Sequence, residues 1–433
     1  MNIAYILPEF VTEKEAGGLA TYYDNVARLL ADAGHSITIF VQSDVSETLD
    51  YYSRIIVERI YINLEGVNPN IPGAFIRTWS EGLKNALCSK IAAGVCYDLV
   101  QYPNFMGYAI DRINIPTVVR VSSYRPILRA ADQEIFDISK EYKSIKVPDF
   151  IEDIAVMKAD AIYGPSKLIA ACIKEQTGRE VEIIESPFYP KNEINHLLKG
   201  NKQWIKDKKY AITFGSLKIL KGAKLIGDCV FEILDKCPDL YWIFAGAETD
   251  WIDKKGKKIN PVEYISERAG KHSKRLVFLG KLKQEELFDY ISNSAFCVLP
   301  SRVDNLPNTC IEAMALRKVV IGTSGASFEQ LIEDGENGFL IERENKEMLI
   351  STVHKVYSLD ENKLIEMGIK AEERINEMKP EIILRQLIDF YHSVIHKYTP
   401  YNTRKNIFYE QAIRKYNEIL TQTNIYGVER YLL

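Results

Sequence analysis

The chain lacks the long apolar segments that cross membranes. Nowhere in its 433 residues do about 18 or more uncharged apolar residues follow one another, the length that a spanning helix needs. The apolar run from Met1 to Pro8 is too short for a signal peptide and has no basic flank. We therefore expect a cytoplasmic protein whose contact with a membrane is at most peripheral, at the inner face.

Cysteine and histidine are too few and too scattered for a disulfide framework or a metal centre. The seven cysteines include no Cys-x-x-Cys pair, and their number is odd. They are typical of buried apolar residues in a reducing compartment. His392 and His396 share one helical face, but no third ligand has the spacing of a zinc site. The sequence predicts no bound metal.

An excess of positive charge is also missing. Lys and Arg number 55 against 59 Asp and Glu, so the net charge of −4 gives no bulk reason to bind nucleic acid. No Gly-x-x-x-x-Gly-Lys-Ser/Thr motif is present, which argues against a P-loop nucleotide hydrolase. With 46% hydrophobic and 26% charged residues, the composition is that of a globular protein.

Short apolar runs alternate with helical patterns over almost the whole chain. The runs are apolar on both faces, which is typical of parallel strands buried between helices. A first domain is expected at residues 1–190, with strands at 3–7, 36–41, 55–62, 99–102, 117–121, 161–163 and 182–184. The fold class predicted by this pattern is α/β with a doubly wound sheet.

A break in this alternation predicts a linker at 191–209, which carries the charged run Lys206 to Lys209. A second doubly wound domain is expected at 210–378, with strands at 210–214, 240–245, 276–279, 296–299 and 319–321. Residues 379–433 are expected to be helical. Because such domains bind ligands at the carboxyl ends of their strands, the ligand cleft is expected between the two domains.

The segment from Pro300 to Ala315 carries the clearest chemistry. It follows a buried strand, and Pro307 suits the first turn of a helix. The first amides of that helix, those of Asn308, Thr309 and Cys310, would lack intrahelical partners. They would therefore favour an anion such as phosphate.

Two carboxylates flank this helix start, Asp304 on the loop and Glu312 in the second turn. Carboxylates accept hydrogen bonds from sugar hydroxyls. The spacing alone favours two solvated acids, whereas the whole string favours a ligand that carries both phosphate and hydroxyl groups.

The string resembles the carboxylate-x7-Glu motif of the retaining glycosyltransferases of family 4. Further motifs of that family occur in the same order over about residues 1–345, namely Gly17 to Tyr22, Gly34-His35, Lys158 to Ile162 before Pro165-Ser166, Val277 to Gly280, and Gly335 to Leu340. The resemblance implies the GT-B fold, two Rossmann-like domains that face a central cleft. The N-terminal domain would bind the acceptor and the C-terminal domain the donor, and helices from 379–433 would cross back onto the N-terminal domain.

The resemblance also assigns the donor site. Asp304, usually Glu in the family, would contact the donor sugar, and Glu312 would hold the nucleotide ribose. The segment Gly215 to Gly222 resembles the diphosphate loop, in which Lys221 matches the lysine and Ser216 replaces the usual arginine. Catalytic roles thus fall to Asp304 and Lys221. The donor-binding residues are Gly17, Gly18, Ser216, Lys221, Asp304, Asn305, Leu306, Pro307, Asn308, Thr309 and Glu312.

The acceptor side departs from the family at Ser122, where members often have a histidine. No side-chain base is therefore visible, which is compatible with the front-face mechanism proposed for the family, in which the leaving phosphate receives the acceptor proton. Ser122, Arg120 and Arg125 are the candidate acceptor-binding residues. The arginines suit an anionic acceptor, and a solvated helix face is the alternative.

The function implied is a metal-independent, retaining hexosyltransferase without a cofactor. Its co-substrate would be a UDP-, GDP- or ADP-sugar, and its acceptor a glycan, a lipid-linked sugar or a small molecule in cell-surface polysaccharide or glycoconjugate biosynthesis. Two alternatives stay open. One is another GT-B enzyme, such as a phosphorylase or a sugar-nucleotide epimerase. The other is a non-catalytic nucleotide-sugar-binding partner of a glycosyltransferase, which the serines at 122 and 216 favour.

Overall fold

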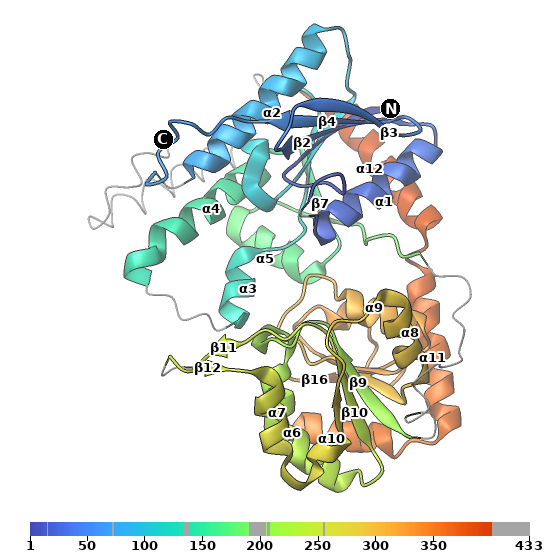
Figure 1. Ribbon diagram of the computed structural model, residues 1–433. Coiled ribbons are helices and arrows are strands. Elements are labelled where there is room, and N and C mark those ends of the chain that lie inside the picture. The colour runs from blue at the N-terminus through green and yellow to red at the C-terminus, as the bar shows by residue number, and fades with distance from the viewer. Residues whose placement is uncertain are drawn as a thin grey trace. The chain divides into compact units, whose positions relative to one another are not determined.

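The computed structural model describes residues 1–14, 16–71, 73–132, 138–189, 205, 208–253 and 256–400 (Figure 1). The chain forms two compact units. The first unit holds Met1–Arg125, Phe136–Pro187 and the segment from Pro380 onward, and the second holds Pro126–Ile135 and Phe188–Lys379. Most of the linker predicted at 191–209 lies outside the described residues, as do residues 401–433. The short segment from Pro126 clusters with the second unit, although the sequence analysis placed it in the first domain.

An eight-stranded sheet forms the centre of the first unit, in the order β3-β4-β2-β1-β5-β6-β7-β8. All neighbours are parallel except β3, which runs antiparallel to β4. Successive strands are added on one side of β1 as far as β4, and then on its other side from β5. The switch point of this sheet therefore lies between β1 and β5. The strands are β1 (Asn2–Leu7), β2 (Ser36–Ser43), β3 (Glu47–Tyr52), β4 (Ile55–Tyr61), β5 (Leu99–Pro103), β6 (Thr117–Arg120), β7 (Ala161–Gly164) and β8 (Glu182–Ile183).

Helices cover this sheet, and one of them comes from the far end of the chain. They are α1 (Gly18–Asp32), α2 (Ala74–Ala92), the 3-10 helix η1 (Phe105–Asp111), α4 (Ile138–Lys158), α5 (Lys167–Thr177) and α12 (Pro380–Lys397). Tyr391 of α12 is fully buried, and its hydroxyl donates to Gln101 Oε1 of β5 and lies 3.3 Å from Tyr5 Oη of β1. The last helix is thus part of the core of the first unit.

A six-stranded parallel sheet forms the second unit, in the order β13-β10-β9-β14-β15-β16. Its switch point lies between β9 and β14, because strands are added first on one side of β9 and then on the other. The strands are β9 (Tyr210–Phe214), β10 (Tyr241–Ala245), β13 (Leu276–Phe278), β14 (Phe296–Val298), β15 (Val320–Thr323) and β16 (Phe339–Ile341). A separate two-stranded hairpin pairs β11 (Trp251–Ile252) with β12 (Lys258–Ile259).

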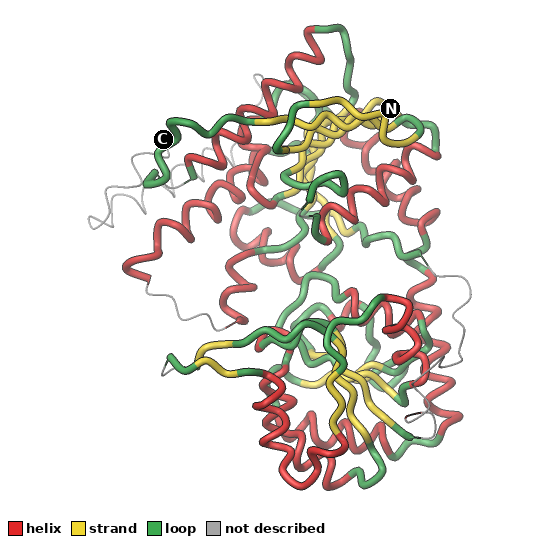
Figure 2. Tube along the Cα trace, in the orientation of Figure 1, coloured by secondary structure: helices red, strands yellow, loops and turns green. Residues whose placement is uncertain are grey.

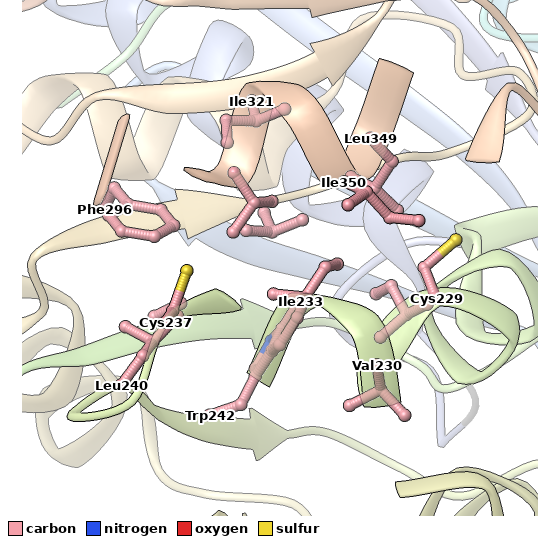
Figure 3. Packing of buried hydrophobic residues seen from close by; sticks show 14 of the residues in the cluster. Cys229, Val230, Ile233, Cys237, Leu240, Trp242, Phe296, Ile321, Leu349 and Ile350 are labelled. Carbon is pink, nitrogen blue, oxygen red and sulfur yellow. The ribbon is translucent and has the colours of Figure 1, made fainter. Parts of the chain in front are cut away.

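Two apolar layers sandwich this second sheet, because alternate residues of each strand face opposite sides. Trp242 and Phe244 pack with α6 (Ala223–Lys236) and α10 (Lys346–Tyr357), and Figure 3 shows Trp242 facing Ile233. Ile243 packs on the opposite face. The helices of that face are α8 (Gln284–Asn293), α9 (Asn308–Ala315) and α11 (Glu361–Asn376). Figure 2 shows the resulting layers of helix and strand, and α7 (Pro261–Ala269) completes the first of them.

The predicted α/β class with parallel sheets is confirmed. Three features of the two units were not predicted from the sequence, namely β3, the hairpin β11–β12 and β16. β3 has no buried residue, so it lacks the apolar signal of a central strand. Within the described residues, we find no helix with the length and apolarity to cross a membrane.

Candidate functional site

Two loops meet at the switch point of the second sheet. The loop after β9 runs from Gly215 to Gly222 and includes the short 3-10 helix η3 (Ile219–Lys221), and the loop after β14 leads to α9. The Arg302 amide donates to the Leu220 carbonyl at 2.8 Å, which joins the loops. Gly222 has φ 82°, and a Cβ there would lie 2.3 Å from the Pro300 carbonyl oxygen. Only glycine lets the two loops approach this closely.

This approach brings together the two residues predicted to be catalytic. Lys221 Nζ forms an ion pair with Asp304 Oδ2. The side chains are 31% and 17% exposed, so the pair is only partly shielded from water. Ion pairs that keep contact with water contribute on the order of 1 kcal/mol, so a ligand can separate this partly exposed pair at a modest cost.

The backbone around Asp304 is held from two sides. The Asn305 amide donates to Asp304 Oδ1 at 3.1 Å, and the Ser327 hydroxyl donates to the Asp304 carbonyl at 2.9 Å. The side-chain oxygen of Asn305 is buried and has no hydrogen-bond partner in the described part of the chain. A buried acceptor of this kind is costly unless a ligand or water satisfies it.

A buried arginine fixes the start of the same loop. Arg302 is 3% exposed, and its guanidinium forms two parallel hydrogen bonds with the Glu344 carboxylate, at 2.8 and 2.7 Å. Its third nitrogen donates to the Ala131 carbonyl at 3.0 Å, in the segment from Pro126 that belongs to the second unit. This bidentate geometry is the strongest that an arginine and a carboxylate can adopt.

The start of α9 is open to a ligand, although less so than predicted. Pro307 is the N-cap and supplies no side-chain cap. The prediction for Cys310 was wrong, because its amide donates to the Pro307 carbonyl at 2.9 Å in a tight first turn. Thr309 Cγ2 lies 3.5 Å from the position of a Cβ on Gly215, so the two loops also face each other here.

The other predicted donor residues of the second unit lie around these loops. Ser216 and Glu312 are half-buried, and Glu312 is in the second turn of α9. The side chains of Leu306 and Pro307 are buried, so they could contact a ligand only through their backbone. Asn308 is exposed at the first position of the helix.

In the first unit, the Gly17-Gly18 turn already has an anionic partner. Glu9 Oε1 accepts from the amides of Gly17 and Ala20, each at 3.2 Å, at the N-terminal end of α1. A Cβ on Gly17 would lie 3.1 Å from that same oxygen. Gly17 therefore permits the carboxylate contact, whereas a Cβ on Gly18 would meet nothing within 4 Å, and Glu9 lies where the amides would otherwise meet a phosphate.

The acceptor candidates of the first unit have different surroundings. Arg125 Nε pairs with Glu152 Oε1 at 3.0 Å, and burial raises the pKa of the Glu152 carboxyl to about 7. Arg120 is buried and donates to Ser122 Oγ at 2.6 Å. The alternative of a solvated helix face is therefore wrong for Arg120, the last residue of β6.

Four residues of these sites were missed from the sequence: Glu9, Arg302, Ser327 and Glu344. Arg302 lies within the best-matched motif and could have been noted as a charge in the loop that follows a buried strand. No local signal identifies its partner 42 positions later. In the described residues, we find no group of three or more His, Cys, Asp or Glu that could hold a metal ion.

Together, these two doubly wound units have the GT-B fold of glycosyltransferases. The chain resembles a sucrose-phosphate synthase from Thermosynechococcus elongatus with a TM-score of 0.67 at 17% identity, over 92% of this chain and 100% of that chain. It resembles an E. coli structure, described as trehalose-6-phosphate bound with UDP-2-fluoro glucose, with a TM-score of 0.66 at 10% identity, over 92% and 100%. A glycosyltransferase from Rickettsia africae gives a TM-score of 0.62 at 17% identity, over 92% and 99%.

The family comparison is more specific for the second unit. Residues 197–374, most of the second unit, match the family described as "Glycosyl transferases group 1". Lys221, Asp304 and Glu312 all lie within the matched residues. No curated protein sequence matches the chain.

Proposed function

We propose that the protein is a metal-independent, retaining glycosyltransferase of the family 4 type, which moves a hexose from a nucleotide-diphospho sugar to an acceptor held by the first unit. One observation carries the proposal. Lys221 and Asp304 meet at the switch point of a group 1 glycosyltransferase domain, where open α/β sheets bind their ligands.

The donor diphosphate would replace Asp304 as the partner of Lys221. Because the existing ion pair is partly exposed to water, exchanging the carboxylate for phosphate oxygens has a modest cost. The backbone amides at the start of α9, together with the helix dipole, would also stabilise the phosphate. Both groups oppose the charge that develops on the leaving phosphate, which lowers the barrier to transfer.

Asp304, released from Lys221, would then act on the sugar. Its carboxylate would orient the hexose and offset positive charge as the anomeric carbon becomes oxocarbenium-like. Asn305, whose buried oxygen has no hydrogen-bond partner among the described residues, would accept from a donor hydroxyl. The nucleotide ribose would bind Glu312, and the acceptor proton would pass to the leaving phosphate in a front-face reaction.

The proposal also covers the acceptor, the cellular location and the class of donor. We infer an acceptor that is a glycan, a lipid-linked sugar or a small molecule in glycoconjugate biosynthesis. All seven cysteines are free, which supports a reducing, cytoplasmic location. The structure bound with UDP-2-fluoro glucose supports a nucleotide sugar as donor.

The donor assignment is tested by thermal shift of the full chain against a panel of nucleotide sugars, followed by transfer and hydrolysis assays with the best binder. Retention requires that the product keep the anomeric configuration of the donor, which NMR measures. EDTA should leave turnover unchanged. Rescue by magnesium or manganese after EDTA inactivation would contradict a metal-independent site.

Two substitutions separate the roles of the acids. Asp304→Asn should cut turnover sharply while nucleotide binding persists, because the contact acts mainly in the transition state. Glu312→Ala should weaken even the free nucleoside diphosphate. Glu285→Ala, an exposed carboxylate at the start of α8, serves as the control and should change neither. Normal turnover in Asp304→Asn would refute its catalytic role.

The two alternatives give different results in the same assays. A phosphorylase would use free inorganic phosphate as a substrate, and an epimerase would convert the nucleotide sugar without an acceptor. A non-catalytic partner would bind the nucleotide sugar without turnover for any acceptor tested.

A further inference from the structure

Arg120 is a buried cation without an acidic partner among the described residues. It is 4% exposed, and its guanidinium carbon lies 3.4 Å from the centre of the Tyr22 ring. Its terminal nitrogens donate to Ser122 Oγ at 2.6 Å and to Ser186 Oγ at 3.1 Å, while Nε has no hydrogen-bond partner in the part of the chain that the structure describes. Buried charges in proteins are normally paired with an opposite charge.

Other arginines of the first unit show the usual arrangement. Arg112 pairs with Asp160 at 2.7 Å, Arg59 with Glu13 at 2.8 Å, and Arg125 with Glu152 at 3.0 Å. Arg120 thus differs from its neighbours in charge balance, since its described partners are two hydroxyls and a ring. Its positive charge is left for a ligand to neutralise.

Ser122 and Ser186, which accept hydrogen bonds from Arg120, are more exposed to solvent than the arginine itself. Each hydroxyl accepts a hydrogen bond from Arg120, so its own proton must point elsewhere. Neither hydroxyl has an acceptor in the described chain, and both serines are half-exposed. Two hydroxyl donors therefore stand in front of a guanidinium, and this set of donors is suited to the oxygens of an anion.

The position of this group is that of a ligand site. Arg120 ends β6, beside β5, at the carboxyl edge of a parallel sheet whose switch point is formed by β1 and β5. Tyr22 reaches the guanidinium from the first turns of α1, and Ser186 follows β8. All four residues belong to the first unit.

We propose that Arg120, Ser122 and Ser186 form an oxyanion site, and that the acceptor of this enzyme is an anionic sugar held through a phosphate or carboxylate group. The identification of the ligand as an acceptor rests on the proposed function, whereas the anion site itself does not depend on that function. Arg125 is excluded from this role, because its Nε already contacts an acidic partner, Glu152 Oε1, at 3.0 Å. A neutral acceptor would leave the charge of Arg120 buried and uncompensated.

The first experiment measures the melting temperature of the full chain in phosphate, in acetate and in chloride at equal ionic strength. We expect one or both oxyanions to raise the melting temperature above its value in chloride, and the stronger of the two identifies the phosphate or carboxylate source. The rise should persist in Lys221→Ala, which removes the cation of the second unit. No rise with either oxyanion, or a rise that disappears in Lys221→Ala, would overturn the proposal.

The second experiment removes the guanidinium. Arg120→Met keeps the volume but not the charge, so it should abolish the oxyanion response and weaken apparent binding on the order of 10-fold or more. In chloride it should be at least as stable as the parent, because an unneutralised buried charge has been removed. A lower melting temperature in chloride together with an intact oxyanion response would show a purely structural arginine.

If Arg120→Met does not fold, Ser186→Ala provides the test of the oxyanion site. It lies outside the strands and should reduce the oxyanion response several-fold, whereas a normal response would refute the site. Nucleotide-sugar binding, measured in the same variants, reports on the proposed function separately. Its loss with an intact oxyanion response would refute the donor assignment and leave the anion site standing.

Discussion

Lys221 and Asp304, 83 positions apart in the sequence, form an ion pair between the two loops at the switch point of the second sheet. The cation assigned to the donor phosphates is thus engaged by the carboxylate assigned to the donor sugar. Under the proposed assignment, donor binding separates the two side chains, and the affinity for a donor then includes the free energy of that separation.

Replacing Asp304 with asparagine should therefore release Lys221 for the phosphates. We expect Asp304→Asn to bind nucleoside diphosphates as tightly as the parent or a few-fold tighter, since a partly exposed ion pair contributes on the order of 1 kcal/mol. Isothermal titration with UDP, GDP and ADP measures this. Markedly weaker binding would show that Asp304 contacts the nucleotide.

Removing the lysine should have the opposite effect. Lys221→Ala loses a charge-assisted contact of about 1.5–3 kcal/mol and should weaken diphosphate binding roughly 10- to 100-fold. Lys224→Ala, one turn away on α6 and paired with Asp228, is the matched control and should bind normally. Equal affinity for Lys221→Ala and the parent would remove Lys221 from the site.

The close approach of the loops at Gly222 should be sensitive to one methyl group. Gly222→Ala combines a positive φ with a Cβ 2.3 Å from a carbonyl oxygen, so we expect a loss of about 2–5 kcal/mol in the free energy of unfolding. Gly34→Ala has φ 90° with open space around it and should lose only about 1 kcal/mol. Urea denaturation compares the two, and equal losses would refute the steric argument.

The pair of Arg302 and Glu344 should respond asymmetrically to mutation. The Arg302 side chain is 4% exposed, whereas that of Glu344 is 38% exposed. Glu344→Ala takes the carboxylate from a buried guanidinium and should cost about 3 kcal/mol, but Arg302→Met leaves only a half-solvated acid and should cost less. The unfolding free energies of both variants test this order, and the reverse order would contradict it.

Glu152 should give the first unit a pH-dependent stability. Burial raises the pKa of its carboxyl from 4.5 to about 7. The folded state then binds the proton more tightly than the unfolded state, so this stabilisation is present below pH 4.5 and is lost as the pH rises toward 7. The parent should therefore lose up to about 3 kcal/mol relative to Glu152→Gln between pH 4.5 and pH 8. A difference between the two proteins that does not change with pH would show that folding does not raise the pKa of Glu152.

The sequence predicted what local chemistry determines. Apolar runs located the central strands. The family resemblance of two separate segments assigned Lys221 and Asp304 to one site, and the two side chains do form an ion pair. The sequence could not predict which distant side chains would meet. Glu344 lies beyond the motif that it stabilises, and the burial of Arg120 depends on Tyr22 and Ser186, which come from other parts of the chain.

The contribution of α12 to the first unit has a consequence during synthesis. Tyr391 reaches Gln101 and Tyr5 only after the ribosome has made Phe188–Lys379, the main segment of the second unit. At usual rates of about 5–20 residues per second, that delay is roughly 10 to 40 s. During this time the apolar face of the N-terminal sheet that packs against α12 is not yet covered by that helix. Chaperone contact and premature aggregation should therefore concentrate on that face while translation continues.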